Sequence, residues 1–205
     1  GMVPSTAFTG VIASTIHRFR TAAPDVNIVW HELLMDAQLD ELLAGRLDLG
    51  FLRLPWEGAD LRFCTRVLHR EKILLAVPED DPAASSGRVA LGELRERRFI
   101  MSPLPATMGL SASVHLLCRK AGFAPDVVMT SRQFPVMLNL VGAGMGVAFV
   151  PESVAAIRIP GIALLELDDP EAFTEIALIY RSESAALPVR KFIESIETQG
   201  PGQCP

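Results

Sequence analysis

The segment GRLDLGFLRLP at residues 45–55 constrains the fold more than any other part of the chain. Its apolar residues form a run too short for an independent helix and typical of a buried parallel strand, namely Leu47, Leu49 and Phe51. A helical pattern covers residues 36–45 before it, with leucines on one face and Gly45 as the stop. A helix that leads directly into a buried strand indicates an α/β sheet with right-handed crossovers.

Arg53 ends this predicted strand, and Pro55 terminates it. In open α/β sheets, ligands bind beyond the carboxyl ends of the strands, so a cation at this position points toward a binding crevice. The alternative is a surface arginine in a surface salt bridge, which is the commoner situation for arginines. We favour the ligand-binding interpretation because other sequence signals converge on the same crevice.

Strand and helix patterns alternate along the chain. Helical patterns cover residues 10–22, 36–45, 89–97, 110–121, 133–144 and 188–198, and a short one begins at residue 151. Strand patterns cover residues 2–4, 26–32, 47–53, 61–68, 72–78, 99–101, 127–129, 145–150, 162–167 and 175–180. This order predicts an α/β fold that begins with a βαβαβ unit.

The alternation breaks near residues 77–78 and again near residues 167–170. Two βα groups that share a pair of crossing segments form a two-lobed protein with its ligand in the cleft. We expect two Rossmann-like lobes joined by two crossing strands, with residues 1–76 and 168–205 in lobe I and residues 77–167 in lobe II. Residues 2–4 read as the end of a strand, so we also expect the chain to be a piece of a longer protein. A polar loop is expected at residues 56–60 and a frayed tail at residues 200–205.

Charge and cysteine usage exclude several classes of partner. The net charge of −5 and a pI of about 5.4 argue against this chain itself lying along a phosphate backbone. No apolar run approaches membrane-spanning length, and no secretory leader is recognisable. The three cysteines match neither a disulfide framework nor a zinc pattern, being widely spaced at Cys64, Cys118 and Cys204. We expect unpaired cysteines in a reducing cytoplasm, and no membrane contact.

Enzyme motifs are incomplete. The glycines of residues 142–146 follow a helix and precede a strand, which is the reverse of a phosphate-binding loop. Residues 109–113 differ from a nucleophile elbow because Ser113 replaces its last glycine. His115 and Cys118 lie three residues apart as half of a metal site, but nothing else at ligand spacing supports one. We therefore expect no catalytic residues, no metal and no cofactor.

Anion-binding chemistry is better supplied. Three predicted helix starts carry small hydroxyl side chains or exposed amides, at residues 5–6, 102–109 and 131–133. A helix start has unpaired N–H groups and a partial positive charge, which suits a carboxylate. Arg53 would add a charge-assisted, bidentate partner. The same hydroxyls cap their own helices, and capping is compatible with ligand binding.

Several stretches, taken in order and spacing, resemble the effector-binding domain of LysR-type transcriptional regulators. They are GMVPST at 1–6, HRFRTAAPDVNI at 17–28, HE at 31–32, QLDELLAGRLDLGFLR at 38–53, EKILLAVP at 71–78, LVGAGMGVAFVP at 140–151 and LELDDP at 165–170. This resemblance covers nearly the whole chain and implies a type 2 periplasmic-binding-protein-like fold with a small-molecule effector in the interlobe cleft. It implies a homodimer or tetramer, with residues 10–22 as a candidate dimer surface. It also implies an N-terminal winged helix-turn-helix that binds DNA and is absent from this chain.

The look is closest to regulators of aromatic-acid catabolism that sense benzoate or muconate. In those, a hydroxyl matched here by Thr6 binds the effector carboxylate, and an arginine matched by Arg53 lines the cleft. Met35 stands where those regulators use a threonine, and residues 103–110 form a more apolar wall. The resemblance and the helix starts together predict ten ligand-binding residues: Ser5, Thr6, Met35, Arg53, Ser102, Pro103, Met108, Leu110, Ser131 and Phe134.

Two other functions use this fold. A solute-binding protein of a transporter would need a secretory leader or lipid anchor, and unpaired cysteines speak against it. A bilobal enzyme would need a nucleophile, a metal set or an acid–base pair that the sequence does not supply. We therefore expect a cytoplasmic sensor whose organic-acid effector biases the oligomer that presents the DNA-binding domains.

Overall fold

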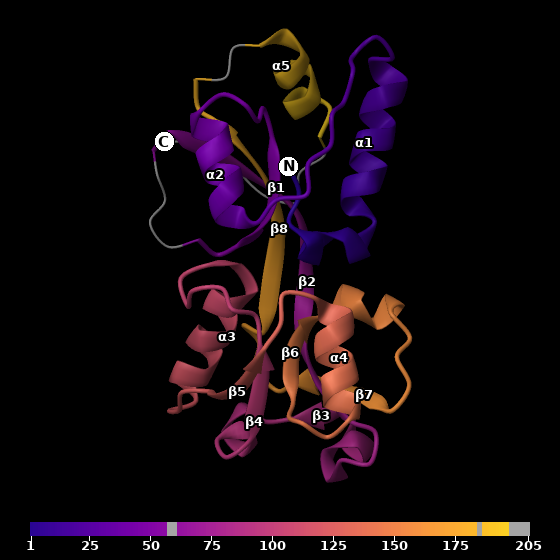
Figure 1. Ribbon diagram of the computed structural model, residues 1–205, viewed down its shortest axis with the longest axis vertical. Coiled ribbons are helices and arrows are strands. Elements are labelled where there is room, and N and C mark those ends of the chain that lie inside the picture. Colours follow the sequence, from indigo (N-terminus) through magenta and orange to yellow (C-terminus); the bar gives the residue numbers. More distant parts are fainter. Residues whose placement is uncertain (57–60, 184–185, 197–205) are drawn as a thin grey trace. The chain divides into compact units, whose positions relative to one another are not determined.

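The computed structural model describes residues 1–56, 61–183 and 186–196. These residues form two compact units (Figure 1). Unit 1 contains the described residues of 1–54, 61–70 and 175–196, and unit 2 contains residues 55–56 and 71–174. Strands β2 (Phe63–Pro78) and β8 (Phe173–Arg181) each begin in one unit and end in the other. The expected division into lobe I (residues 1–76 and 168–205) and lobe II (residues 77–167) stays a prediction.

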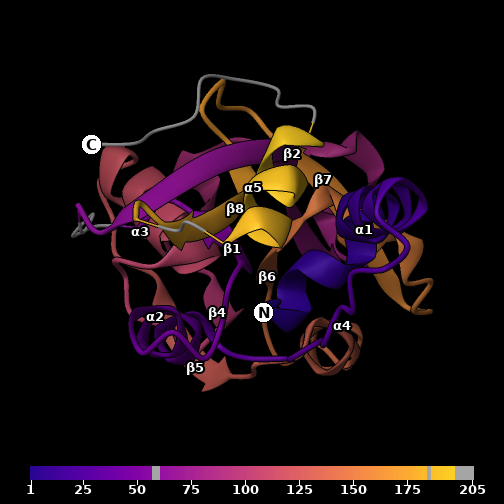
Figure 2. The same cartoon turned by 90° about the horizontal axis from the view of Figure 1, so that it is seen from above.

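Unit 1 is built on β1 (Gly50–Leu54) and β8, which pair antiparallel. Helices α1 (Val11–Ala22) and α2 (Met35–Leu43) lie on either side of this pair, and α5 (Leu187–Glu194) completes the unit (Figure 2). The core joins aromatic rings from three elements, with ring centroids 4.8 Å apart for Phe19 and Phe192 and 6.3 Å apart for Phe51 and Phe192. Edge-to-face packing of this kind stabilises the unit beyond the area it buries.

The predicted strand around Phe51 is confirmed as buried, but the expectation of purely parallel pairing is wrong, because the strand is parallel to residues 1–3 and antiparallel to β8. Among the described residues its ladder partner is β8, which places Arg53 opposite Ile176 and runs antiparallel. Its parallel pairing in the described part of the chain is the bridge from Met2 to Phe51, in which the Phe51 amide donates to Gly1 O (2.8 Å) and the Val3 amide donates to Phe51 O (3.1 Å). A strand buried on both faces has the same apolar pattern in either direction, so the sequence did not distinguish the two.

The strand predicted over residues 26–32 is also wrong. Only Glu32 forms a bridge, to Met2, although the pattern alternates as a strand should. Val26 and Ile28 pack against the core while Val29 is 66% exposed, as the alternation predicts, but the backbone of this segment does not pair as a ladder. The expected strand tail at residues 2–4 leads into a 3₁₀-helix, η1 (Pro4–Thr9).

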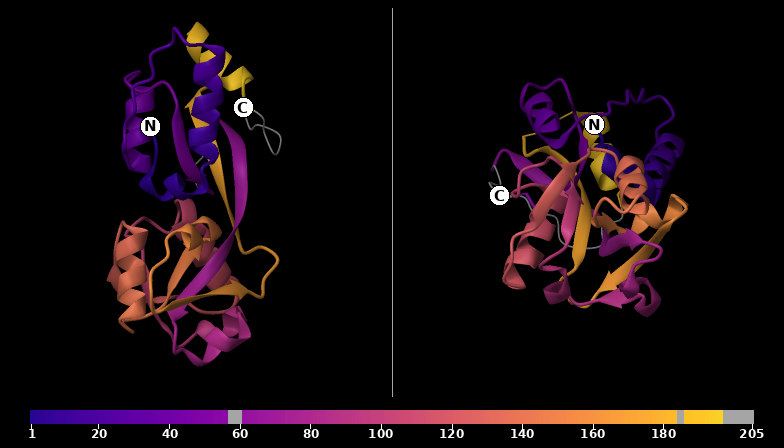
Figure 3. Two further views of the ribbon diagram at one scale, coloured as in Figure 1. Left: turned by 90° about the vertical axis from the view of Figure 1, so that its right-hand side faces the viewer. Right: turned by 60° about the horizontal axis from the view of Figure 1, so that its bottom comes forward.

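In unit 2, the long strand β2 pairs with β6 and β7, β7 pairs with β3, and β4 and β5 form a separate two-stranded sheet (Figure 3). The remaining strands are β3 (Arg88–Val89), β4 (Arg98–Met101), β5 (Asp126–Thr130), β6 (Ala148–Pro151) and β7 (Ile162–Leu167). Backbone bonds from Ile100 N to Val147 O (2.8 Å) and from Val147 N to Arg98 O (2.9 Å) join β4 to the start of β6. Pairs β4–β5 and β3–β7 are parallel, whereas β2 pairs antiparallel with β6 and β7.

Helices α3 (Gly109–Lys120) and α4 (Phe134–Gly142) pack on this sheet, close to their predicted positions. The core under α3 contains Phe99 and Phe149, whose rings stack 5.4 Å apart, together with Cys118. Other predictions need correction. The patterns at residues 61–68 and 72–78 form one strand, and the helix expected at residues 89–97 consists of β3 and a 3₁₀-helix, η3 (Leu91–Leu94). The helix expected from residue 151 is also 3₁₀, η4 (Glu152–Ala156).

Two further expectations concern cysteines and membranes. Cys118 is a free, buried thiol, but Cys64 is disulfide-bonded, so the expectation of unpaired cysteines is wrong for Cys64. Cys204, the tail at residues 200–205 and most of the loop at residues 56–60 lie outside the described residues. No helix in the described part of the chain has the length and apolarity to span a membrane.

Candidate functional site

Arg53 is the charged residue at the centre of the candidate site in unit 1. It lies on β1, and its side chain is 3% exposed. Its Nη2 donates a 2.8 Å hydrogen bond to the carbonyl oxygen of Ser5 in η1. Arg53 is therefore a buried arginine and not a surface one. A guanidinium held by a carbonyl has a fixed orientation, which suits recognition of a planar carboxylate.

Thr6 and Ser5 lie side by side in η1 but differ in what their polar groups do. Thr6 is fully buried, and both its amide (3.0 Å) and its hydroxyl (2.8 Å) donate to the carbonyl of Val3. Thr9 adds a 3.3 Å bond from its hydroxyl to the carbonyl of Thr6. Ser5 is half-buried and offers its carbonyl to Arg53. Thr6 thus stabilises the turn that carries the Ser5 carbonyl.

Met35 begins α2 and is buried at 2% exposure. Three residues later, the fully buried Gln38 donates from Nε2 to the carbonyls of Leu33 (3.1 Å) and Phe51 (3.3 Å). Gln38 therefore ties α2 to the strand that carries Arg53. Gln38 is not among the ten predicted residues, although a polar residue three positions from Met35 and four from Leu42 falls on the apolar face of the helix.

Four of the ten predicted residues, Ser5, Thr6, Met35 and Arg53, belong to unit 1, and the other six belong to unit 2. Ser102 is half-buried and Pro103 exposed in the loop after β4. Met108 and Leu110 are half-buried and flank the first residue of α3. That both groups contact one ligand stays a prediction.

Ser131 and Phe134 mark the start of α4. The Ser131 hydroxyl donates to the Gln133 carbonyl and accepts from the Gln133 amide, both at 3.2 Å. Phe134 is the first residue of the helix and is 7% exposed, and Pro135 follows it. Ser131 therefore shapes the turn before the helix, and Phe134 contributes apolar surface.

The electrostatics of the helix starts are mixed. The first turns of α3 and α4 contain no acidic side chain that would neutralise the partial positive charge there. The amide of Gly109 at the start of α3 is nevertheless already bound, at 2.8 Å, to the carbonyl of Pro55. Pro135 has no amide hydrogen to offer at the start of α4. The starts of α3 and α4 thus favour an anion through their partial positive charge more than through backbone amides available for hydrogen bonding.

Metal binding finds no support. No group of three or more potential metal-binding side chains (His, Cys, Asp or Glu) occurs in the described part of the chain. Burial raises the pKa of the Cys118 thiol to about 12, so it stays protonated at neutral pH and is no thiolate ligand. The Nδ1 atom of His115 lies 2.8 Å from the Ser111 carbonyl, which accounts for that ring within its own helix.

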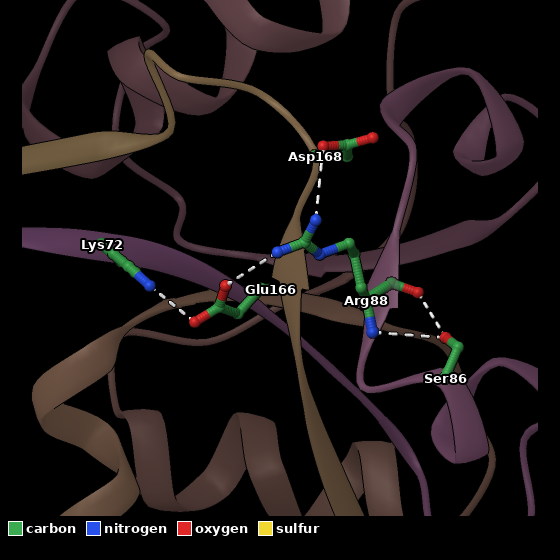
Figure 4. Close-up of polar contacts among 5 residues, drawn as sticks. All are labelled: Lys72, Ser86, Arg88, Glu166 and Asp168. Atoms are coloured by element: carbon green, nitrogen blue, oxygen red, sulfur yellow. Dashed lines mark hydrogen bonds and ion pairs between the residues drawn. The ribbon is translucent and has the colours of Figure 1, made fainter.

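A row of alternating charges crosses β2, β7 and β3 in unit 2 (Figure 4). Lys72 Nζ lies 2.5 Å from Glu166 Oε1, Arg88 Nη2 lies 3.7 Å from Glu166 Oε2, and Arg88 Nη1 lies 4.0 Å from Asp168 Oδ1. The Lys72–Glu166 hydrogen bond raises the pKa of Lys72 and lowers that of Glu166. These side chains are 42–67% exposed and pair with one another, so we assign the row no ligand.

The chain is similar to several known proteins. A family model described as "LysR substrate binding domain" matches residues 1–201. The chain is 29% identical over 194 residues to the HTH-type transcriptional regulator BudR of Raoultella terrigena, covering 95% of this chain and 67% of BudR. It is 28% identical over 198 residues to the HTH-type transcriptional regulator BenM of Acinetobacter baylyi, covering 96% of this chain and 64% of BenM. The chain thus spans about two thirds of the length of these relatives.

Among solved structures, the chain resembles "BenM effector binding domain with its effector benzoate". The TM-score is 0.82 at 28% sequence identity, over 95% of this chain and 87% of that chain. This likeness confirms the predicted fold class, an α/β fold of the type 2 periplasmic-binding-protein-like kind.

Proposed function

The chain belongs to the LysR substrate binding domain family, and we propose that it binds a small organic acid as the sensor of a transcriptional regulator. The matched relatives are HTH-type transcriptional regulators, so this is a family of regulators and not of enzymes. The same relatives favour the regulator over the solute-binding protein of a transporter.

The observation that carries the proposed ligand class is the geometry of Arg53. Its guanidinium is buried at the end of β1 and oriented by the Ser5 carbonyl. A guanidinium has several N–H donors in one plane and recognises a carboxylate with two parallel hydrogen bonds. We therefore propose that the effector carboxylate binds Arg53.

The hydroxyl contact in this proposal comes from Ser5. Thr6 was the residue expected from the family resemblance, but its hydroxyl and amide both donate to Val3. If the Thr6 hydroxyl turned to a ligand, the turn would lose its hydrogen bond to Val3. Ser5 is half-buried, and among the described contacts its hydroxyl makes no hydrogen bond that holds the turn. Ser5 is accordingly the better donor to a carboxylate in this loop.

The remaining predicted residues suggest the shape of the acid. Met108, Leu110 and Phe134 offer apolar surface at the starts of α3 and α4. A ligand that uses both a carboxylate-binding group and apolar surface would be a ring or short chain with the charge at one end. The benzoate named as the effector of BenM supports an aromatic acid for this chain.

The proposed full-length protein is a cytoplasmic oligomer that binds DNA through a helix-turn-helix domain outside this chain. We propose α1 as part of the contact between copies. A groove of about 1190 Å³ runs along α1 and residues 24–30, and Trp30 at its edge is 42% exposed. Exposed apolar surface next to a groove is typical of subunit contacts.

A thermal-shift experiment with benzoate tests the proposed ligand class. At about a hundred times its dissociation constant, a ligand stabilises the folded chain by about 2.7 kcal/mol, which is several degrees for a domain of this size. Benzamide has the same ring without the charge and is the matched control, for which we expect no shift. If no aromatic acid or dicarboxylic acid raises the melting temperature, the proposal is wrong.

A further inference from the structure

Gly109 has an unusual backbone for the first residue of a helix. Its φ is +54°, in the left-handed region that side chains other than glycine adopt only with strain. Its amide, which in a free helix start would point to solvent or to an anion, donates instead to the carbonyl of Pro55 at 2.8 Å. The left-handed turn and the bond to Pro55 occur at the same residue.

A second backbone contact lies beside the first. Trp56 and Met108 form an antiparallel bridge, so residues 55–56 are joined to the residues just before α3 over more than one position. Pro55 has a fixed φ and only a carbonyl to offer, which makes it a stiff acceptor. The start of α3 is therefore held by a short piece of chain from outside that helix.

This piece of chain directly follows the strand that carries Arg53. Arg53 and Pro55 are separated by one residue, and the strap contacts Met108 and Gly109, next to Leu110. We infer that residues 55–56 form a strap that positions the apolar wall of the effector site, and that Gly109 is the positioning residue that lets the strap bind. The positioning role rests on the proposed function, whereas the strap itself does not.

The Gly109 amide is thereby assigned to the strap and not to the effector. Since this donor is bound to Pro55, the effector carboxylate receives no hydrogen bond from it. The strap instead makes the placement of Met108 and Leu110 depend on residues 55–56. A substitution that straightens the turn at Gly109 should loosen this wall without touching Arg53.

Gly109→Ala tests the strap, because alanine disfavours a positive φ. Gly87→Ala is the matched control: Gly87 has a φ of +64°, lies in unit 2, and has no atom within 4 Å of the added Cβ. Both variants carry the same kind of strain, but only one lies at the strap. In ligand-free protein, we expect amide exchange in residues 105–112 to become about tenfold faster in Gly109→Ala and to stay unchanged in Gly87→Ala.

Benzoate binding provides the second measurement. We expect the dissociation constant to rise about tenfold in Gly109→Ala and to stay within about twofold in Gly87→Ala. Gly109→Asn should recover most of both properties, because asparagine tolerates the left-handed region better than alanine does.

Three results would count against the inference. Equal exchange in the alanine variants, or no recovery with asparagine, would overturn the strap. Faster exchange with unchanged benzoate affinity would overturn the positioning role. A wild-type chain that binds no benzoate would count against the proposed effector, while the exchange measurement, made without ligand, would still decide whether the strap exists.

Discussion

Arg53 and Ser5 lie 48 residues apart in sequence and are joined by a 2.8 Å hydrogen bond from the guanidinium Nη2 to the Ser5 carbonyl oxygen. This bond connects the strand β1 to the turn η1. It orients the arginine, and its acceptor is a backbone atom, so it does not depend on which side chain stands at position 5.

Arg53→Ala should abolish the stabilisation of the chain by benzoate. The variant removes the proposed carboxylate partner, and a thermal-shift titration measures the loss directly. Arg46→Ala is the control, since Arg46 pairs with Glu41 at 2.7 Å on an exposed surface of the same unit. Retention of the full benzoate shift in Arg53→Ala would contradict the proposed role.

Ser5→Ala and Thr6→Val should separate ligand binding from folding. Ser5→Ala removes the proposed donor and should weaken benzoate binding by about 1 kcal/mol, with little change in unfolding free energy. Thr6→Val removes the buried bond to Val3 and should lower the unfolding free energy by about 1–3 kcal/mol. Urea unfolding and calorimetric titration of both variants distinguish the roles, and the reverse pattern would restore Thr6 as the ligand donor.

Cys118 should resist alkylation in the folded chain. Its side chain is fully buried, and burial raises the pKa of the thiol to about 12, so very little reactive thiolate exists at pH 8. Mass spectrometry after iodoacetamide treatment should find Cys118 modified in urea and unmodified in buffer. Rapid modification in buffer would show that the core under α3 opens readily.

Gly146→Ala should destabilise unit 2. A Cβ at this position would lie 2.8 Å from the Arg98 carbonyl oxygen, where β4 and β6 meet. Because the obstructing atom belongs to the backbone, the strands must move apart, at a cost of about 1–3 kcal/mol in unfolding free energy. Gly92→Ala is the control, since nothing lies within 4 Å of its Cβ. Equal unfolding midpoints in urea would refute the close approach.

The pair of Lys72 and Glu166 should make a contribution to stability that depends on pH and salt. The hydrogen bond lowers the pKa of Glu166 in the folded chain, so its contribution is present above the unfolded pKa and is lost as the pH falls through the folded value. The pKa of Lys72 is raised, so its contribution is lost only as the pH rises through the folded lysine pKa. We therefore expect the pair to stabilise the chain at pH values above the range in which Glu166 titrates and below the range in which Lys72 titrates.

Glu166→Gln measures this contribution. Both side chains are more than two-fifths exposed, so the difference from wild type should be small at neutral pH and should shrink with added salt. Urea unfolding at neutral and at acid pH, each with and without salt, provides the comparison. A difference that grows with salt would exclude an electrostatic origin.

Local patterns predicted most helices, because a helix is stabilised by contacts between residues three and four apart. The apolar faces of α1, α3 and α5 and the glycine at the end of α2 were all readable in this way. Residues 26–32 show where a local pattern is insufficient. They alternate as a strand should, but in the described part of the chain they pair with another segment only through the bridge from Glu32 to Met2. A local pattern does not reveal how many backbone hydrogen bonds a segment will form with a neighbouring strand.

The sequence by itself determined the alternating α/β order, the buried strand ending at Arg53, and the resemblance through which the chain is recognised as an effector-binding domain. Only the tertiary structure decided three hydrogen-bond assignments. Thr6 donates to the Val3 carbonyl, Gln38 donates to the Phe51 carbonyl in β1, and the Gly109 amide donates to the Pro55 carbonyl. The physical reason is that a donor or acceptor can be satisfied by any residue that folding brings within reach, including residues far away in sequence. Residue types therefore identify the groups available for binding, and the fold decides which of them are already in use.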